Sequence, residues 1–140
     1  DRHPWCARVY EEDPGRADEG GVTMIKNAQI KSTMLGYEDH GILTCSICLD
    51  YGDSSGQSFG GYTLDAPRKD PAGKFLGRFG TAYGAEFIAK ILNTVGVQTW
   101  EELKGNHIRA DAEYTEVLGI GHITKDLWFY PKKDMILVGG

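Results

Sequence analysis

Residues 64–95 decide the fold, with the sequence LDAPRKDPAGKFLGRFGTAYGAEFIAKILNTV. The stretch begins at the end of a glycine-rich strand and passes through a polar loop that contains Pro67, Pro71 and Gly73. It ends in the one long helix that the sequence predicts, over about 82–95. Apolar side chains at helical spacing form one face of this helix, namely Phe87, Ile88, Ile91, Leu92 and Val95. Gly96 predicts the end of the helix, because glycine readily adopts the left-handed conformation.

Three strands are predicted before this helix. We expect them over 25–34, 42–51 and 57–64, because apolar and polar residues alternate there. A turn over 35–41, with glycine at both ends, and a loop over 52–56 would connect them. Short links of this kind favour an antiparallel meander.

Further elements are predicted after the helix. Thr99 and Glu102 have the spacing of a capping box, which predicts a one-turn helix that ends at Gly105. Residues 106–114 alternate cleanly as a strand, and 116–128 form a last strand that Gly119 and Gly121 weaken. The expected fold class is α+β, with an antiparallel sheet of about five strands covered by one long and one short helix.

The composition bounds the class of protein. The chain has 140 residues, which suits one domain, and 41% of them are hydrophobic, which is enough for a core. No apolar run approaches a membrane span, and no apolar signal segment lies near the start. The net charge of −5 argues against nonspecific binding to nucleic-acid backbones. We expect a single α+β domain over 24–131 and a C-terminal tail over 132–140.

Residues 1–23 differ from the rest of the chain. They are rich in charge, proline and glycine, and they show no sustained period. Met24 then opens a clean strand, and the codons that can encode 19–24 include a bacterial ribosome-binding sequence. We therefore expect that Met24 is the biological start and that 1–23 is an extension from outside the native protein. The alternative is an ordinary N-terminal arm that docks through Trp5 and Tyr10.

The cysteines favour a structural role. Three are too few for a disulfide scaffold, and the odd number favours free thiols in a reducing compartment. Cys45 and Cys48 have a CxxC spacing, but residues three apart on a strand point to opposite faces. That geometry fits neither a zinc pair nor a thioredoxin-type turn. We interpret both as structural thiols, with Cys45 on the apolar face of its strand and Cys48 on the polar face.

Glu38, Asp39 and His40 stand together in the predicted turn. A carboxylate beside an imidazole is the minimum for metal binding or acid–base chemistry. Asp and His are also ordinary turn residues, and no HxxxH or HExxH spacing accompanies them. The sequence also lacks a Walker loop, a GxGxxG motif after a strand and a GxSxG nucleophile elbow. We therefore predict no catalytic residue, no metal and no cofactor.

A set of side chains suited to recognition remains. Phosphate needs guanidinium or backbone N–H donors, and a nucleotide base needs an aromatic face. Both kinds of group occur between 78 and 109, and Gly60-Gly61 predicts a bulge or a close approach by a backbone or ligand. In the alternative interpretation, Lys90 and Lys104 are solvated and Arg109 pairs with Asp111 or Glu113. The candidate ligand-binding residues are Gln57, Phe59, Arg78, Phe79, Tyr83, Lys90, Asn106 and Arg109. In one shared site, Arg78 and Arg109 would bind phosphate, Phe79 and Tyr83 would stack on a base or ribose, and Gln57 and Asn106 would hydrogen-bond polar edges.

Seven segments resemble those of a widespread group of small phage and prophage proteins. They are IKNA (25–28), LGYEDHGI (35–42), QSFGGYTLD (57–65), FI (87–88), VGV (95–97), WEELKG (100–105) and IGH (120–122). The match covers essentially 24–131 and leaves out the N-terminal stretch. In size and element order the chain is similar to the Thoeris anti-defence sponge proteins of phages.

This resemblance implies a function and an assembly. Such sponges bind cyclic ADP-ribose isomers made by bacterial TIR-domain enzymes, and some bind cyclic oligonucleotides at separate sites, without cleaving either. The resemblance implies a homo-oligomer, dimer or hexamer, in the cytoplasm of an infected bacterium, with neither polymeric nucleic acid nor membrane as partner. Trp100, Trp128 and Phe129, expected to be exposed, favour an interface between subunits. The alternatives are a metal-dependent phage hydrolase or nuclease that uses Asp39 and His40, and a structural or host-protein-binding factor.

Overall fold

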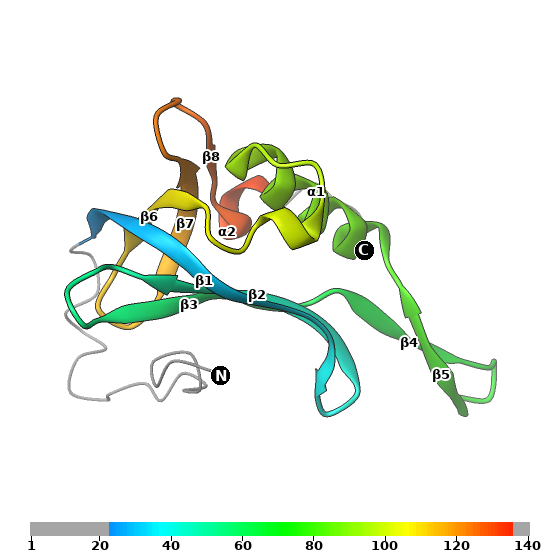
Figure 1. Ribbon diagram of the computed structural model, residues 1–140. Coiled ribbons are helices and arrows are strands. Elements are labelled where there is room, and N and C mark those ends of the chain that lie inside the picture. The colour runs from blue at the N-terminus through cyan, green and yellow to red at the C-terminus, as the bar shows by residue number, and fades with distance from the viewer. Residues whose placement is uncertain (1–22, 136–140) are drawn as a thin grey trace.

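The computed structural model describes residues 23–135, which form a mixed fold of helices and mostly antiparallel sheet (Figure 1). Six strands form one sheet in the order β3-β2-β1-β6-β7-β8, and β4 and β5 form a separate two-stranded sheet. The predicted mixed class is confirmed, whereas about five strands was too low a count. The elements are β1 (Met24–Asp39), β2 (Ile42–Asp50), β3 (Gly56–Thr63), β4 (Asp65–Lys69), β5 (Phe75–Gly80), α1 (Ala82–Val95), η3 (Trp100–Glu102), β6 (His107–Ala112), β7 (Val117–His122), β8 (Trp128–Phe129) and α2 (Pro131–Asp134).

Strand β1 is the centre of the large sheet. Its first part pairs with β6 from Met24 to Gln29, and its later part pairs with β2 as far as Asp39. The predicted seven-residue turn is therefore wrong, because the strand continues to Asp39. The turn consists of His40 and Gly41, whose φ angles of 53° and 78° suit a two-residue hairpin.

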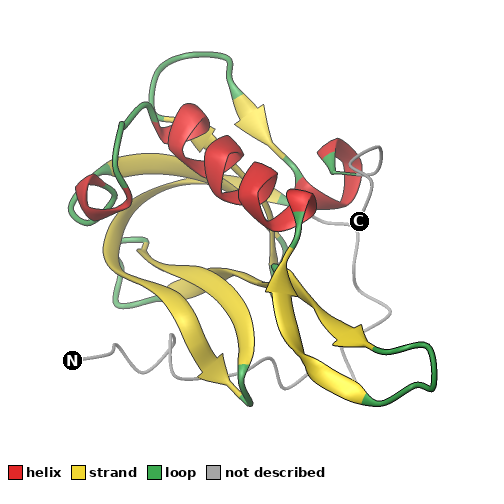
Figure 2. Cartoon of the chain, turned by 90° about the vertical axis from the view of Figure 1, so that its right-hand side faces the viewer, coloured by secondary structure: helices red, strands yellow, loops and turns green. Residues whose placement is uncertain are grey.

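The six-stranded sheet curls around the core, and α1 lies across its open side (Figure 2). Helix α1 has the predicted bounds, and Gly96 ends it with a φ of 90°. Phe87 from this helix packs 5.2 Å from the ring of Phe129 and 6.3 Å from the ring of Phe59, measured between centroids. The capping box of Thr99 and Glu102 is also present, on a 3-10 turn. Local patterns therefore predicted α1 and the capped turn at Thr99, whereas α2 was not predicted.

Gly60 and Gly121 allow a backbone and a ring, respectively, to approach closely. A Cβ added at Gly60 would lie 2.4 Å from the carbonyl oxygen of Cys45, and the β2–β3 register shifts beside it, so the predicted close approach is confirmed. A Cβ at Gly121 would lie 2.6 Å from the ring of Trp128. The single strand predicted over 116–128 is wrong, because the chain turns after β7 and returns as β8, which places Trp128 over Gly121.

The two cysteines of the CxxC spacing have different environments. Cys45 is a fully buried free thiol, which confirms its predicted structural role. Cys48 is disulfide-bonded, so the prediction of a free thiol is wrong there. Because disulfides are typical of oxidising compartments, the cysteines no longer favour a reducing one.

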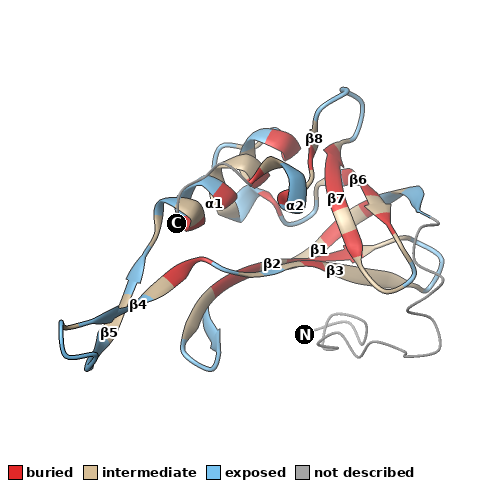
Figure 3. Ribbon diagram, turned by 180° about the vertical axis from the view of Figure 1, so that it is seen from behind, coloured by how far each residue is buried: buried red, intermediate tan, exposed pale blue. Residues whose placement is uncertain are grey.

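Residues 65–80 form a projecting hairpin of β4 and β5, which we call the arm. A polar loop was predicted there, and this prediction is wrong. Asp70 accepts hydrogen bonds from the backbone N–H groups of Ala72 at 2.9 Å and Lys74 at 2.8 Å, which closes the turn. Pro67 is tolerated because a two-stranded sheet consists only of edge strands. Most of the arm is exposed (Figure 3).

The packed part of the chain does not end where the predicted domain ends. The tail predicted over 132–140 begins inside α2, and Met135 is buried in the core, so the packed chain extends at least that far. The prediction that 1–23 is an extension falls, apart from Thr23, outside the described residues. Neither helix of the described part is long and apolar enough to cross a membrane.

Candidate functional site

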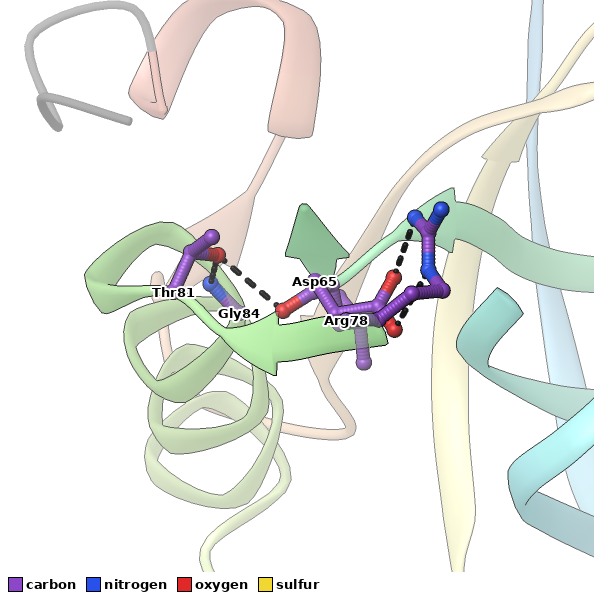
Figure 4. Close-up of polar contacts among 5 residues, drawn as sticks. Asp65, Arg78, Thr81 and Gly84 are labelled. Carbon is purple, nitrogen blue, oxygen red and sulfur yellow. Dashed lines mark hydrogen bonds and ion pairs between the residues drawn. The ribbon is translucent and has the colours of Figure 1, made fainter. Parts of the chain in front are cut away.

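The base of the arm is fixed by a carboxylate and a guanidinium. Arg78 donates to both carboxylate oxygens of Asp65, at 2.9 Å from Nε and 2.7 Å from Nη2 (Figure 4). The hydrogen bonds from Arg78 hold the pKa of Asp65 below its ordinary value, even though burial opposes the shift. Arg78 was predicted to bind a phosphate, but the structure commits two of its N–H groups to Asp65.

Beyond this pair, Thr81 joins the arm to α1. Its hydroxyl donates to the carbonyl of Leu64 at 3.0 Å and accepts from the backbone N–H of Gly84 at 3.0 Å (Figure 4). Thr81 is therefore the N-cap of α1 and anchors the helix to Leu64, the residue between β3 and the arm.

A cation and an aromatic ring meet on the arm. The guanidinium of Arg68 lies 5.0 Å from the ring centroid of Phe79, and both side chains are exposed. Arg78 and Phe79, predicted to act together, are neighbours on β5, so their side chains leave opposite faces of the hairpin. Sequence reasoning missed Arg68, although the turn residues 70–73 between two short alternating segments are a signal for a hairpin.

The two candidates on α1 contact their own helix. Tyr83 is half-buried, its ring lies 6.2 Å from that of Phe87, and burial raises the pKa of its hydroxyl. Lys90 lies 3.6 Å from Glu86, one turn earlier. Glu86 is exposed and Lys90 is partly exposed, so this pair is closer to the alternative interpretation of Lys90 as part of a solvated helix face than to a ligand contact.

Arg109 holds the loop between β7 and β8. Its Nε donates to the carbonyl of His122 at 2.8 Å and its Nη2 to the carbonyl of Lys125 at 2.7 Å. Its guanidinium also lies 4.7 Å from the ring centroid of Trp128. The structure therefore gives Arg109 internal partners, which are neither a phosphate nor the acidic neighbours of the alternative interpretation.

The two candidate amides also bond to carbonyls of the chain. The Gln57 amide donates to the carbonyls of Glu113 at 3.1 Å and Tyr114 at 3.2 Å, and its oxygen accepts from the Tyr51 hydroxyl. This network ties β3 to the loop after β6. Asn106 donates to the carbonyl of Glu102 at 2.5 Å. Both contacts are typical of loop fixation.

The predicted site residues thus lie in several separate environments. Phe59 is 1% exposed and belongs to the core. Among the eight candidates, Phe79 is the large hydrophobic side chain that remains exposed. Of these candidates, Phe79 is therefore the one whose side chain can contact a ligand, and it lies on one face of the arm.

Asp39 and His40 lie at the tip of the β1–β2 hairpin. His40 Nδ1 and Asp39 Oδ1 are 2.8 Å apart, and the His40 side chain is 93% exposed. Within residues 23–135, no three His, Cys, Asp or Glu side chains are grouped so that they could share a metal ion. The pair has no further ligand beside it in the described structure.

Comparisons of the chain with models of protein families, with curated proteins and with solved structures gave no match.

Proposed function

We propose that this chain is a noncatalytic protein that binds and sequesters a phosphorylated nucleotide through its arm. The observation that carries the proposal is the exposed Arg68–Phe79 pair, at 5.0 Å, on a hairpin that also presents Lys69 and Lys74. The resemblance found in the sequence supports a cyclic nucleotide, a cyclic ADP-ribose isomer or a cyclic oligonucleotide, as the ligand class.

The chemistry of the pair suits such a ligand. A guanidinium placed over a ring keeps its edge N–H groups for phosphate oxygens and its outer plane for a nucleotide base. The neighbouring lysines add charge that attracts a polyanion without fixing its geometry. Arg78 supports the site from the other face, because its bond to Asp65 holds the base of the arm.

The place of action is a separate part of the proposal. A phage-encoded sponge acts in the cytoplasm of an infected bacterium, and this location rests on the resemblance. The disulfide at Cys48 weighs against a reducing location. The location can be tested by blocking free thiols in intact cells before lysis and then measuring whether Cys48 is oxidised. If Cys48 is oxidised when thiols are blocked before lysis, the cytoplasmic location is wrong.

The binding test is calorimetry with cyclic ADP-ribose isomers and cyclic di- and trinucleotides. We expect Arg68→Ala and Phe79→Ala each to weaken binding by about one to two decades, since each removes an interaction of about 1.5–3 kcal/mol. Lys104→Ala is the matched control, because Lys104 is an exposed cation beyond the arm. Wild-type protein that binds no member of the panel would refute the function, and equal binding by all variants would refute the site.

A second measurement addresses catalysis. The bound ligand is released by heat and its mass is determined. Intact ligand supports sequestration, whereas a hydrolysed product would show that the chain is an enzyme and would favour the alternative based on Asp39 and His40.

A further inference from the structure

The loop between β7 and β8, residues 123–127, is held by two side chains of the sheet (Figure 1). Arg109 donates to the carbonyls of His122 and Lys125, as described above. His122, the last residue of β7, accepts hydrogen bonds at its Nδ1 from the backbone N–H groups of Thr124 and Lys125, both at 3.1 Å. One side chain therefore fixes carbonyl groups of this exposed loop, and the other fixes its N–H groups.

The contacts of His122 specify the form of its imidazole ring. A ring nitrogen that accepts from N–H groups carries no hydrogen, so the closed loop requires the neutral ring with its hydrogen on Nε2. A proton added to Nδ1 turns this acceptor into a donor that faces two other donors, and both hydrogen bonds are lost. The closed loop therefore binds one proton fewer than the open loop, and a lower pH favours the open loop.

The charged groups beside His122 include one that opposes a second positive charge. Arg109 reaches the His122 carbonyl from β6, with Nε 2.8 Å from the oxygen. His107, also on β6, precedes Ile108, the residue that pairs with His122, so its side chain leaves the other face of the strand. Lys125 and Asp126 lie in the loop itself, carry opposite charges and are exposed.

The end of α1 faces the other side of the ring. A Cβ added at Gly96 would lie 3.5 Å from Nε2 of His122, and residues 92–95 carry no charged side chain. The end of a helix favours a positive charge. It faces Nε2, however, which holds a hydrogen in both forms of the ring, so it does not replace the acceptor that the loop loses. Strand β8, on the other side of the loop, contains no charged residue.

Trp128 follows the loop and connects it to Arg109. The prediction that Trp100, Trp128 and Phe129 are exposed is wrong, because Phe129 is buried and the two tryptophans are half-buried. The ring of Trp128 lies over Gly121, and its centroid is 4.7 Å from the guanidinium of Arg109. Because Arg109 contacts this ring and two carbonyls at the loop, opening of the loop releases the guanidinium as well.

We propose that the β7–β8 loop is a pH-sensitive latch, which the neutral His122 ring closes and the protonated ring releases. In the closed form, two N–H donors of Arg109 are occupied by carbonyls of the chain. In the open form, these donors become available to solvent and to anions. The latch is independent of the proposed nucleotide site, because it uses no residue of the arm.

NMR spectra of the full chain, recorded from about pH 8 to about pH 5, test the latch, because histidine changes its charge in this range. We expect the amide signals of Thr124 and Lys125 to shift with the same midpoint as the carbon signals of the His122 ring. The protection of both amides against hydrogen exchange should fall about tenfold, since each loses its acceptor. The Nε–H signal of Arg109 should weaken with the same midpoint, and a change confined to the His122 ring would not move it.

Two variants hold the loop in one form. His122→Asn supplies a side-chain oxygen that can bond to the backbone two residues on and does not titrate, so Thr124 should stay protected throughout the titration. His122→Ala has no acceptor, so Thr124 and Lys125 should exchange rapidly throughout. The matched control is His40→Asn, because His40 is 93% exposed at a distant hairpin tip, and its pH dependence should equal that of the wild type.

Three results would overturn the latch. The first is a His122 ring that protonates while the amides of Thr124 and Lys125 keep their positions and protection. The second is a ring that stays neutral to the end of the titration, and the third is a His122→Asn protein with the pH dependence of the wild type. Circular dichroism verifies folding at each pH, and the wild-type titration decides the question even where a variant does not fold.

Discussion

Substituting Gly84 by alanine sets two effects of opposite sign against each other. Alanine is favoured over glycine inside a helix by about 1 kcal/mol, so propensity alone predicts a more stable protein. In the structure, however, a Cβ at Gly84 would lie 2.1 Å from the carbonyl oxygen of Leu64 and 2.9 Å from its Cβ. The first of these atoms belongs to the backbone and cannot rotate away. Helix α1 would have to move by roughly 1 Å to restore an ordinary contact.

Crowding of this kind costs about 1–3 kcal/mol. The shift also strains the Thr81 hydroxyl, which bonds to the Leu64 carbonyl and caps the helix, and a lost cap costs about 1 kcal/mol. We therefore expect Gly84→Ala to lower the free energy of unfolding by about 1–3 kcal/mol after the propensity gain is subtracted.

Urea unfolding followed by circular dichroism measures this difference directly. The control is Ala85→Gly at the next, exposed position, which should lower stability by about 1 kcal/mol through propensity alone. The sign of the change in unfolding free energy shows whether crowding or helix propensity dominates. A Gly84→Ala protein as stable as the wild type, or more so, would show that α1 is not pressed against Leu64.

Three further predictions concern single side chains. Arg109→Ala should lower the free energy of unfolding by about 1.5–3 kcal/mol in a urea titration, because two charged hydrogen bonds are lost, and it should leave nucleotide affinity unchanged. If the Arg109→Ala protein were as stable as the wild type but bound the nucleotide much more weakly, Arg109 would belong to the ligand site. Cys45→Ser should cost about 1–3 kcal/mol in the same assay, since it buries a hydroxyl on the apolar side, and an unchanged midpoint would contradict this. Because the pKa of Asp65 is lowered in the fold, its pairing with Arg78 stabilises the protein above the ordinary value of 3.8 and is lost as the pH falls below it. Unfolding free energies measured from pH 6 to pH 2 should therefore fall less steeply for Asp65→Asn, and identical slopes would refute the assignment.

The elements that the sequence predicted well are those whose signals are local. Helix α1, its Gly96 terminus and the Thr99 capping box each depend on residues a few positions apart. The buried face of β6, with Ile108, Ala110 and Ala112, follows from simple alternation. Such signals are present in the sequence regardless of the surrounding fold.

The arm and the end of β1 were missed for a shared reason. Both are exposed hairpins, so charged residues, glycine and proline are tolerated and the apolar alternation that marks a strand is diluted. The clearest remaining signal was the turn chemistry around Asp70 and at His40-Gly41.

The sequence could identify residue types suited to a ligand site, but it could not predict which of them lie together. Arg109, Gln57 and Asn106 have donors that suit a ligand, but the fold directs them to its own carbonyls. A sequence shows that a donor exists and does not show which distant loop will present an acceptor to it. Arg68 illustrates the converse, because it acquires an aromatic neighbour only when β4 pairs with β5.

Strand β1 has a consequence for the order of events on the ribosome. Its later part finds β2 immediately, across the turn at His40-Gly41, whereas its first part waits for β6, which begins at His107. Local pairings form early and distant ones late. Until β6 emerges, the backbone of residues 24–28 offers unpaired N–H and C=O groups beside the exposed side chains of Met24 and Ile25. The nascent chain is therefore most prone to pair wrongly with a neighbouring chain between the emergence of β2 and the emergence of β6, and slowing translation before β6 has emerged would lengthen that interval.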